Sequence, residues 1–284
     1  MARTWSTGLV EVADGVYAYL QEGGGLCVAN AGLIVGPESC IVIDALFAPS
    51  MTRAFREQIA RVTDKPVRLL INTHHHVDHT MGNALFPEAT ILSHANARTE
   101  QARNGKGVLQ ILRPLIPELV GETDGLELRL PDLTFQGELS LHLGERELRL
   151  VHLGTAHTIG DALVVLPQER LVFTGDVVFD QVTPLAFEGH IGNWIAVCDK
   201  VEALDAGTLV PGHGPVGDKT GLRDMRAYLR SIHEQARAAF DAGTPAQEAA
   251  KAIDLGAYAS WAEPERIALN TARLYQEFRG EISA

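Results

Sequence analysis

Short runs of branched apolar residues, separated by turns rich in glycine, proline and charge, recur along most of the chain. Runs of roughly four to eight such residues between turn signals are typical of buried β-strands. They predict strands at residues 16–20, 27–35, 40–44, 67–72, 90–94, 133–135, 138–143, 147–153, 162–166 and 171–179.

Apolar positions at helical spacing lie between some of these strands and dominate the last part of the chain. Helices are predicted at about residues 49–62, 80–86 and 194–204, with a further helix ending near residue 104. From about residue 218 the chain is expected to be helical, with one apolar face that comprises Leu222, Met225, Leu229, Ile232 and Ala236. Two successive blocks of strand, helix and strand predict an α/β fold with the four layers of an αββα sandwich and with C-terminal helices.

The candidate chemistry is concentrated in the hexapeptide HHHVDH at residues 74–79, directly behind an apolar strand. Imidazole and carboxylate are ligands that zinc and similar divalent metals prefer. If the chain stays extended, His74 and His76 point to one side of the strand, toward one metal. Asp78 and His79 would lie where strand gives way to helix, facing a second metal. A purification tag would lie at a terminus and carry no interleaved aspartate.

Three further polar residues end short apolar strands in glycine-rich loops. His157 lies in GTAHTIGD, Asp176 in FTGD and His213 in VPGHG. Loops at the edge of a rigid sheet can hold side chains from distant parts of the chain around one point. These three residues are therefore candidates to complete a metal site with the hexapeptide.

The motifs H-x-H-x-D-H, G-x-x-H-T-x-G-D, T-G-D and P-G-H-G occur in this order, and over residues 8–216 the chain resembles the metallo-β-lactamase-fold hydrolase superfamily. The resemblance implies two metal sites that share one ligand. The first site would comprise His74, His76 and His157. The second would comprise Asp78, His79 and His213, with Asp176 bridging both. Asp44, which ends an apolar strand, would orient a ligand without binding metal.

Asp176 also bears on the branch of this superfamily. The best-known zinc β-lactamases carry a cysteine ligand there or lack a bridging carboxylate. The chain therefore resembles the glyoxalase II, lactonase and thioesterase branches more closely. We expect a catalytic domain at residues 1–216 and, at residues 217–284, a C-terminal helical extension packed on the same domain.

The chemistry that the resemblance implies is hydrolysis. Two divalent metal ions, zinc first with iron or manganese as alternatives, would hold a hydroxide that attacks the carbonyl of a thioester, ester or lactone. Asp78 would orient that hydroxide. The chain has no G-x-S-x-G elbow and its three cysteines have no recognisable partner, so covalent serine or cysteine catalysis is not supported. The alternatives are a β-lactam hydrolase, an iron-dependent redox enzyme of the same fold, and a non-catalytic metal-bound module.

Three features are candidates for substrate contacts. Residues 105–120 are apolar and interrupted by glycines and prolines, which predicts either a helix packed on the core or on a second copy, or a lid or pocket wall. His190 lies in a loop after the Asp176 strand and could contact substrate or donate a proton. Arg223 belongs to a basic stripe at helical spacing, which is either a solvated face or a contact for an anionic substrate group.

Composition narrows the choice of partners. A net charge of −12 and a pI near 5.3 disfavour binding to nucleic acid, whose phosphates require clustered lysine and arginine. No apolar run reaches membrane-spanning length, no secretory signal is visible, and the three cysteines predict buried free thiols. We therefore expect a cytoplasmic enzyme with a small-molecule substrate and no membrane partner, and a homo-oligomer is compatible with the sequence.

Overall fold

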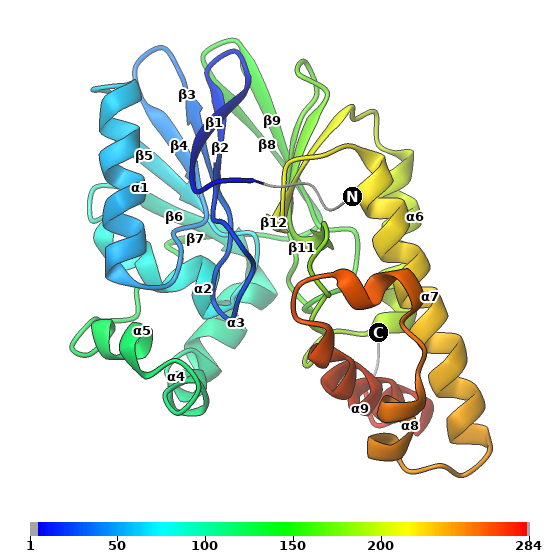
Figure 1. The fold of residues 1–284 in the computed structure, drawn as a ribbon. Helices are drawn as coiled ribbons and strands as arrows, with labels where there is room; N and C mark the ends of the chain where they lie inside the picture. Colours follow the sequence, from blue (N-terminus) through cyan, green and yellow to red (C-terminus); the bar gives the residue numbers. More distant parts are fainter. Residues whose placement is uncertain (1–4, 283–284) are drawn as a thin grey trace.

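Two β-sheets face each other, with helices on both outer faces (Figure 1). The structure, a computed structural model, describes residues 5–282. The seven-stranded sheet has the order β1 (Gly8–Ala13), β2 (Val16–Leu20), β3 (Ala31–Val35), β4 (Cys40–Ile43), β5 (Val67–Ile71), β6 (Thr90–His94) and β7 (Leu133–Phe135). The five-stranded sheet has the order β12 (Thr208–His213), β11 (Leu171–Phe179), β10 (Leu163–Leu166), β9 (Arg146–Val151) and β8 (Glu138–Leu143).

The helices form the outer layers and cover one end of the molecule (Figure 1). On the side of the seven-stranded sheet lie α1 (Pro49–Val62), α2 (Val77–Thr80), the 3-10 helix η1 (Met81–Leu85), α3 (Ala95–Asn104), α4 (Gly107–Leu112) and α5 (Pro117–Glu122). On the side of the five-stranded sheet lie α6 (Ile191–Ala203), α7 (Lys219–Asp241), α8 (Ala246–Ala252), η2 (Gly256–Ser260), η3 (Pro264–Arg266) and α9 (Ile267–Phe278). None of the helices in the described part of the chain has the length and apolar character needed to cross a membrane.

Strands that are apolar at every position are buried on both faces. Successive side chains of a strand point to opposite faces of its sheet. In β3, Leu33 packs in the cluster that contains Phe55 of α1, whereas Ile34 packs in the cluster between the two sheets. In β11, Val172 packs with α6 and α7, whereas Phe173 joins the cluster between the sheets. The continuous apolar runs therefore produce the four-layer αββα sandwich predicted from the sequence.

The C-terminal helices share a core with the five-stranded sheet. Leu222, Met225 and Leu229 of α7 are fully buried in the cluster that also contains Trp194 of α6 and Leu274 of α9. The apolar face predicted from helical spacing is thus the face that packs on the sandwich. A boundary at residue 216 between a catalytic domain and a helical extension stays a prediction.

Two local predictions differ from the structure. The strand expected at residues 27–35 begins only at Ala31, because Cys27 has a φ of 65° and Val28 donates its backbone N–H to Gly25 O in a turn. Strand β1, which was not predicted, pairs antiparallel with β2 and is only partly buried. In the first case an apolar segment adopts a turn, whereas in the second the apolar residues of GLVEVA do form a strand, which lies at the edge of its sheet.

The segment behind the hexapeptide is held against the loop after β4 by a close backbone approach at Gly82. The Gly82 N–H donates to Leu46 O at 2.9 Å, and a Cβ at residue 82 would lie 1.9 Å from Ala45 O. Contacts this short cannot be relieved without moving one backbone segment. The position of Asp78 and His79 therefore depends on a residue without a side chain.

Gly82→Ala is expected to destabilise the fold by about 1–3 kcal/mol, because the added methyl group overpacks a fixed backbone. The free energy of unfolding in urea measures the effect. Gly121→Ala is the matched control: a Cβ there meets nothing within 4 Å, and the change should be neutral or stabilise α5 by up to about 1 kcal/mol. Equal effects of the two substitutions would contradict the close approach.

Candidate metal centre

The hexapeptide lies at the carboxyl end of β5, where the chain changes from strand to helix. His76 still has extended backbone angles, with φ −63° and ψ 148°, and is the N-cap residue of α2. His74 therefore precedes the helix, whereas Asp78 and His79 lie in its first turn. This change in conformation distributes the side chains of one short motif over two neighbouring ligand groups.

The first ligand group comprises His74, His76, His157 and Asp176, whose ligand atoms lie within 4.8 Å of one another. His157 Nε2 is 2.8 Å from His76 Nδ1 and 3.2 Å from Asp176 Oδ2. His74 Nε2 is 3.9 Å from the same carboxylate oxygen. Three imidazoles from two different sheets thus converge beside one carboxylate.

The second ligand group comprises Asp78, His79 and His213, again within 4.8 Å. Asp78 Oδ2 is 3.7 Å from His79 Nε2 and 3.5 Å from His213 Nε2. Asp176 borders this group as well, because its Oδ2 is 3.2 Å from His213 Nε2 and its Oδ1 is 3.1 Å from His79 Nε2. The carboxylate of Asp176 therefore lies between the two groups.

The donor atoms of both groups fit a divalent metal ion. His74 Nε2, His79 Nε2 and Asp176 Oδ1 are buried and make no hydrogen bond. Buried polar atoms without a partner are costly, and a bound cation would satisfy them. Sets of imidazole nitrogen and carboxylate oxygen suit zinc and also suit iron or manganese. The cluster can therefore bind metal, and its donor set is compatible with several ions.

The electrostatics of the two groups differ. Burial lowers the pKa of His157 to about 3, so this imidazole is neutral, which is the form that binds metal. Burial also disfavours protonated His213, but Asp176 and Asp78 raise its pKa to about 9. A cation that enters the second group at neutral pH must therefore displace a proton from His213, whereas the first group offers neutral nitrogen.

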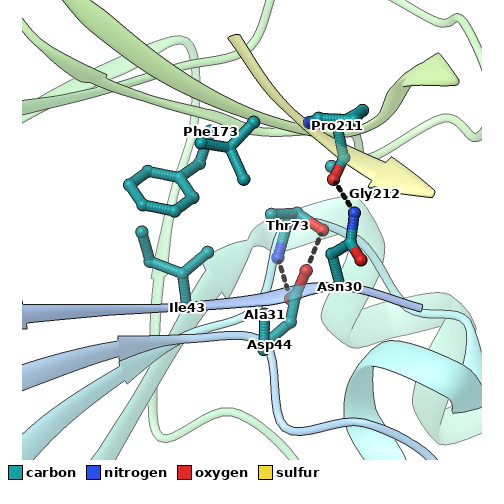
Figure 2. Close-up of a pocket in the computed structure, with 10 residues that line it drawn as sticks. Asn30, Ala31, Ile43, Asp44, Thr73, Phe173, Pro211 and Gly212 are labelled. Atoms are coloured by element: carbon teal, nitrogen blue, oxygen red, sulfur yellow. Dashed lines mark hydrogen bonds between the residues drawn. The ribbon is translucent and has the colours of Figure 1, made fainter. Parts of the chain in front are cut away.

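Asp44 contacts the second group through His79. Its Oδ2 is 2.8 Å from His79 Nδ1, and its two oxygens accept hydrogen bonds from the backbone N–H and the hydroxyl of Thr73 at 2.8 and 2.7 Å (Figure 2). This pairing orients His79 Nε2 toward Asp78 and Asp176. Thr73 was not predicted from the sequence, because a lone threonine beside a histidine carries no recognisable signal.

Asn30, which directly precedes β3, joins the seven-stranded sheet to the end of β12, where His213 lies. Its side-chain amide donates to Pro211 O at 2.9 Å (Figure 2) and to Gly214 O at 2.8 Å. His213 Nδ1 in turn is 2.9 Å from Val28 O, which directs its Nε2 toward the ligand group. Val28 and Asn30, which precede β3, thus help to position His213 at the end of β12.

Glu188 is a further residue that the sequence analysis missed. Its carboxylate lies 3.2 Å from His76 Nε2, the nitrogen opposite the one that meets His157, and 2.8 Å from His75 Nε2. Arg273 of α9 holds the same loop by donating to Glu188 O at 2.5 Å. A carboxylate on the outer nitrogen of a ligand histidine fixes the orientation of its ring.

The other candidate contacts lie elsewhere. His190 caps α6, where its Nδ1 accepts a hydrogen bond from the Asn193 backbone at 3.1 Å. Arg223 pairs with Glu202 of α6 at 2.7 Å on the surface. Neither side chain lines the cavity described next, so the geometry offers no support for a substrate contact by either residue.

Both ligand groups open into one cavity of about 290 Å³. His76, Asp78, His157, Asp176 and His213 contribute to its lining. Within residues 105–120, the side chains of Val108, Ile111, Leu112 and Leu115 border this cavity. Leu112 is at the same time buried against the core, so the segment also packs on the domain. The three cysteines are free and buried, as predicted.

Asp44→Asn is expected to weaken metal binding at the second group by about 10–100-fold, because the amide cannot accept all three hydrogen bonds. Competition with a chromophoric chelator, followed by metal analysis of the washed protein, measures this. Asp14→Asn, at an exposed turn, is the matched control. Unchanged affinity in Asp44→Asn would contradict the orienting role of Asp44.

Gly212→Ala tests whether Asp176 must lie where it does. A Cβ at residue 212 would lie 1.9 Å from Asp176 Oδ1, so we expect the substitution to displace this carboxylate and lower the metal-to-protein ratio. Elemental analysis after dialysis measures the ratio, and circular dichroism confirms the fold. Gly207→Ala, where the nearest atom is 3.9 Å away, should retain the wild-type ratio. A wild-type ratio in both variants would contradict the shared role of Asp176.

Known proteins with similar sequences carry different activities in their names. The chain is 28% identical over 186 residues to 2,4-dinitroanisole O-demethylase subunit alpha of Nocardioides sp., which covers 63% of this chain and 51% of that protein. It is 24% identical over 218 residues to metallo-beta-lactamase type 2 of Bacteroides fragilis, which covers 74% of this chain and 80% of that protein. The chain thus spans about half the length of the demethylase subunit.

Solved structures share the fold at low sequence identity. A metallo-beta-lactamase from Pontibacter korlensis superposes with a TM-score of 0.66 at 18% identity, over 79% of this chain and 99% of that one. A sec-alkylsulfatase from Pseudomonas sp. superposes with a TM-score of 0.72 at 16% identity, over 97% of this chain and 51% of that one. The model of the metallo-beta-lactamase superfamily matches residues 24–213, which include both ligand groups. The chain therefore belongs to the metallo-beta-lactamase superfamily.

Proposed function

We propose that this chain is a hydrolase that uses two divalent metal ions, zinc in the first place, to cleave a thioester, ester or lactone. The observation that carries the proposal is that two groups of ligands border the single carboxylate of Asp176 and open into one cavity. His74, His76 and His157 would hold one ion, Asp78, His79 and His213 the other, and Asp176 would contact both. Such ions polarise a substrate oxygen and lower the pKa of water from about 15.7 toward about 7.

Asp78 is the candidate catalytic residue among these side chains. It lines the cavity, and although burial raises the pKa of a carboxyl group, His79 and His213 hold the pKa of Asp78 below its ordinary value. Its carboxylate is therefore ionised at neutral pH and can orient the attacking water as a hydrogen-bond acceptor. Cys27 also lines the cavity, but burial raises the pKa of its thiol, so a thiolate nucleophile is not favoured.

The names of the relatives widen the choice of scissile bond. They refer to β-lactams and to the O-methyl group of 2,4-dinitroanisole. A linear primary-alkylsulfatase of Pseudomonas sp., 22% identical over 242 residues that cover 72% of this chain and 46% of that protein, adds linear primary alkyl sulfates. The position of Asp176 resembles the glyoxalase II, lactonase and thioesterase branches, which favours a thioester, ester or lactone over a β-lactam. The proteins with similar sequences nevertheless include β-lactamases. An experiment must therefore compare the bonds directly.

The test is a panel of substrates with zinc-loaded protein, containing a glutathione thioester, an aliphatic lactone, an alkyl ester, a chromogenic cephalosporin, an alkyl sulfate and 2,4-dinitroanisole. We expect turnover in one carbonyl class, lowered roughly 100-fold or more in Asp78→Asn because the attacking water loses its acceptor. Asp14→Asn should keep the wild-type rate. Metal content is measured for each variant so that loss of an ion is recognised.

Other outcomes separate the alternatives. Turnover of the cephalosporin, the sulfate or the anisole alone would overturn the carbonyl assignment and keep a metal-dependent hydrolase. Iron in the native protein together with oxygen consumption would favour the redox enzyme. Tight metal binding without turnover on any substrate would favour the non-catalytic module.

A further inference from the structure

The cavity beside the ligand groups has an apolar wall. Helix α4 contributes Val108, Ile111 and Leu112 to this wall, the turn after α4 contributes Leu115, and α9 contributes Leu269. Ile111, Leu115 and Leu269 are 68%, 63% and 52% exposed. Single exposed leucines are ordinary, but several that border one cavity form an apolar surface of the kind that marks a binding site.

Core packing and hydrogen bonds hold this apolar wall in place. Leu112 is 7% exposed and Val120 is fully buried. Both belong to the apolar cluster that contains Val77 of the hexapeptide and Met81, which follows it. Ser50 at the start of α1 donates its backbone N–H and its hydroxyl to Glu122 of α5, each at 2.8 Å. Because these contacts tie the wall to the segment that carries the metal ligands, an apolar group bound there has a fixed position relative to them.

The cavity offers little to a negatively charged group. Arg266 is the one lysine or arginine among the described residues that line it. This guanidinium is 7% exposed, forms an ion pair with Glu263 and donates to Thr183 O at 2.8 Å. Glu188, also in the lining, is occupied by His75 and His76. A substrate carboxylate placed along the apolar wall would therefore be desolvated without a free cation to pair with.

The apolar surface reaches the ligand group itself. Phe187 stacks on the imidazole of His76, with ring centroids 4.9 Å apart and ring planes 21° apart. Phe187 is 37% exposed and lines the same cavity. The bond to be cleaved and an apolar substituent next to it can thus be accommodated together.

We propose that the substrate is a small, uncharged carbonyl compound whose aliphatic or aryl chain packs against Ile111, Leu115 and Leu269 while its carbonyl group lies at the two ligand groups. This inference rests on the proposed hydrolysis. A volume of about 290 Å³ is at the lower end of small-molecule sites.

The first test is a series of ethyl esters from acetate to octanoate, followed in a pH-stat with the zinc-loaded full chain. We expect kcat/KM to rise about four-fold for each added methylene group that becomes buried. Monoethyl suberate, which ends in a carboxylate at the far end of a chain of the same length, should be cleaved at least about ten-fold less efficiently than ethyl octanoate. A flat series, or equal cleavage of the charged ester, would overturn the inference.

Ile111→Gln tests whether the rise of kcat/KM with chain length comes from contact with the apolar wall. Its side chain is mostly exposed, so the fold is expected to remain, and the ratio of kcat/KM for the octanoate to kcat/KM for the acetate should fall about ten-fold. Leu133→Gln is the matched control, because Leu133 is 53% exposed on β7 and does not line the cavity. Equal effects on both esters, or the same loss in Leu133→Gln, would contradict the proposed contact.

A binding measurement separates this inference from the proposed function. Methyl ketones from 2-butanone to 2-decanone carry the carbonyl group without a leaving group, and we expect the increase in Tm to grow with chain length in wild type but not in Ile111→Gln. If that holds while no thioester, ester or lactone is cleaved, the apolar site stands and the hydrolase proposal fails. If no ketone binds, the apolar site is overturned. If sedimentation shows a wild-type dimer that Ile111→Gln dissociates without changing the chain-length profile, the wall is a subunit interface and the inference is overturned.

Discussion

A single buried carboxylate, that of Asp176 within β11, lies between the two ligand groups. His74 and His79 reach it from the segment that follows β5 of the seven-stranded sheet, whereas His157 and His213 come from the loop after β9 and from the end of β12 in the five-stranded sheet. Burial disfavours its ionised form, but the imidazoles around it hold the pKa of Asp176 well below its ordinary value. The ligand atoms therefore come together only when the two sheets pack against each other. The apolar layer between the sheets fixes how they pack.

The parts of the fold that the sequence predicted are those in which local pattern and tertiary burial agree. Strand β11 has three apolar residues on either side of Thr174, Gly175 and Asp176 and is buried at every position, and the hexapeptide follows an apolar strand as expected. The stretch at residues 25–30 fails this rule, because an apolar sequence there adopts turns with positive φ. For residues 105–120 the sequence left open a packed helix or a lid or pocket wall. Only the structure places Ile111 at the cavity.

Contacts between distant segments were beyond the reach of one sequence. Glu188 belongs to no motif, and only the fold brings it to His76. The basic stripe of α7 illustrates the opposite error. Arg223 was a candidate for an anionic substrate, but it meets Glu202, because α6 packs alongside and presents acidic residues to the stripe. The sequence shows a basic stripe on one helix, but only the tertiary structure shows which helix packs against it.

The direct measurement of the central claim is anomalous diffraction from crystals of the zinc-loaded chain, recorded on both sides of the zinc absorption edge. We expect two peaks, one among His74, His76 and His157 and one among Asp78, His79 and His213, each within bonding distance of Asp176. One peak alone, or zinc bound away from Asp176, would contradict the binuclear centre on which the proposed hydrolysis depends.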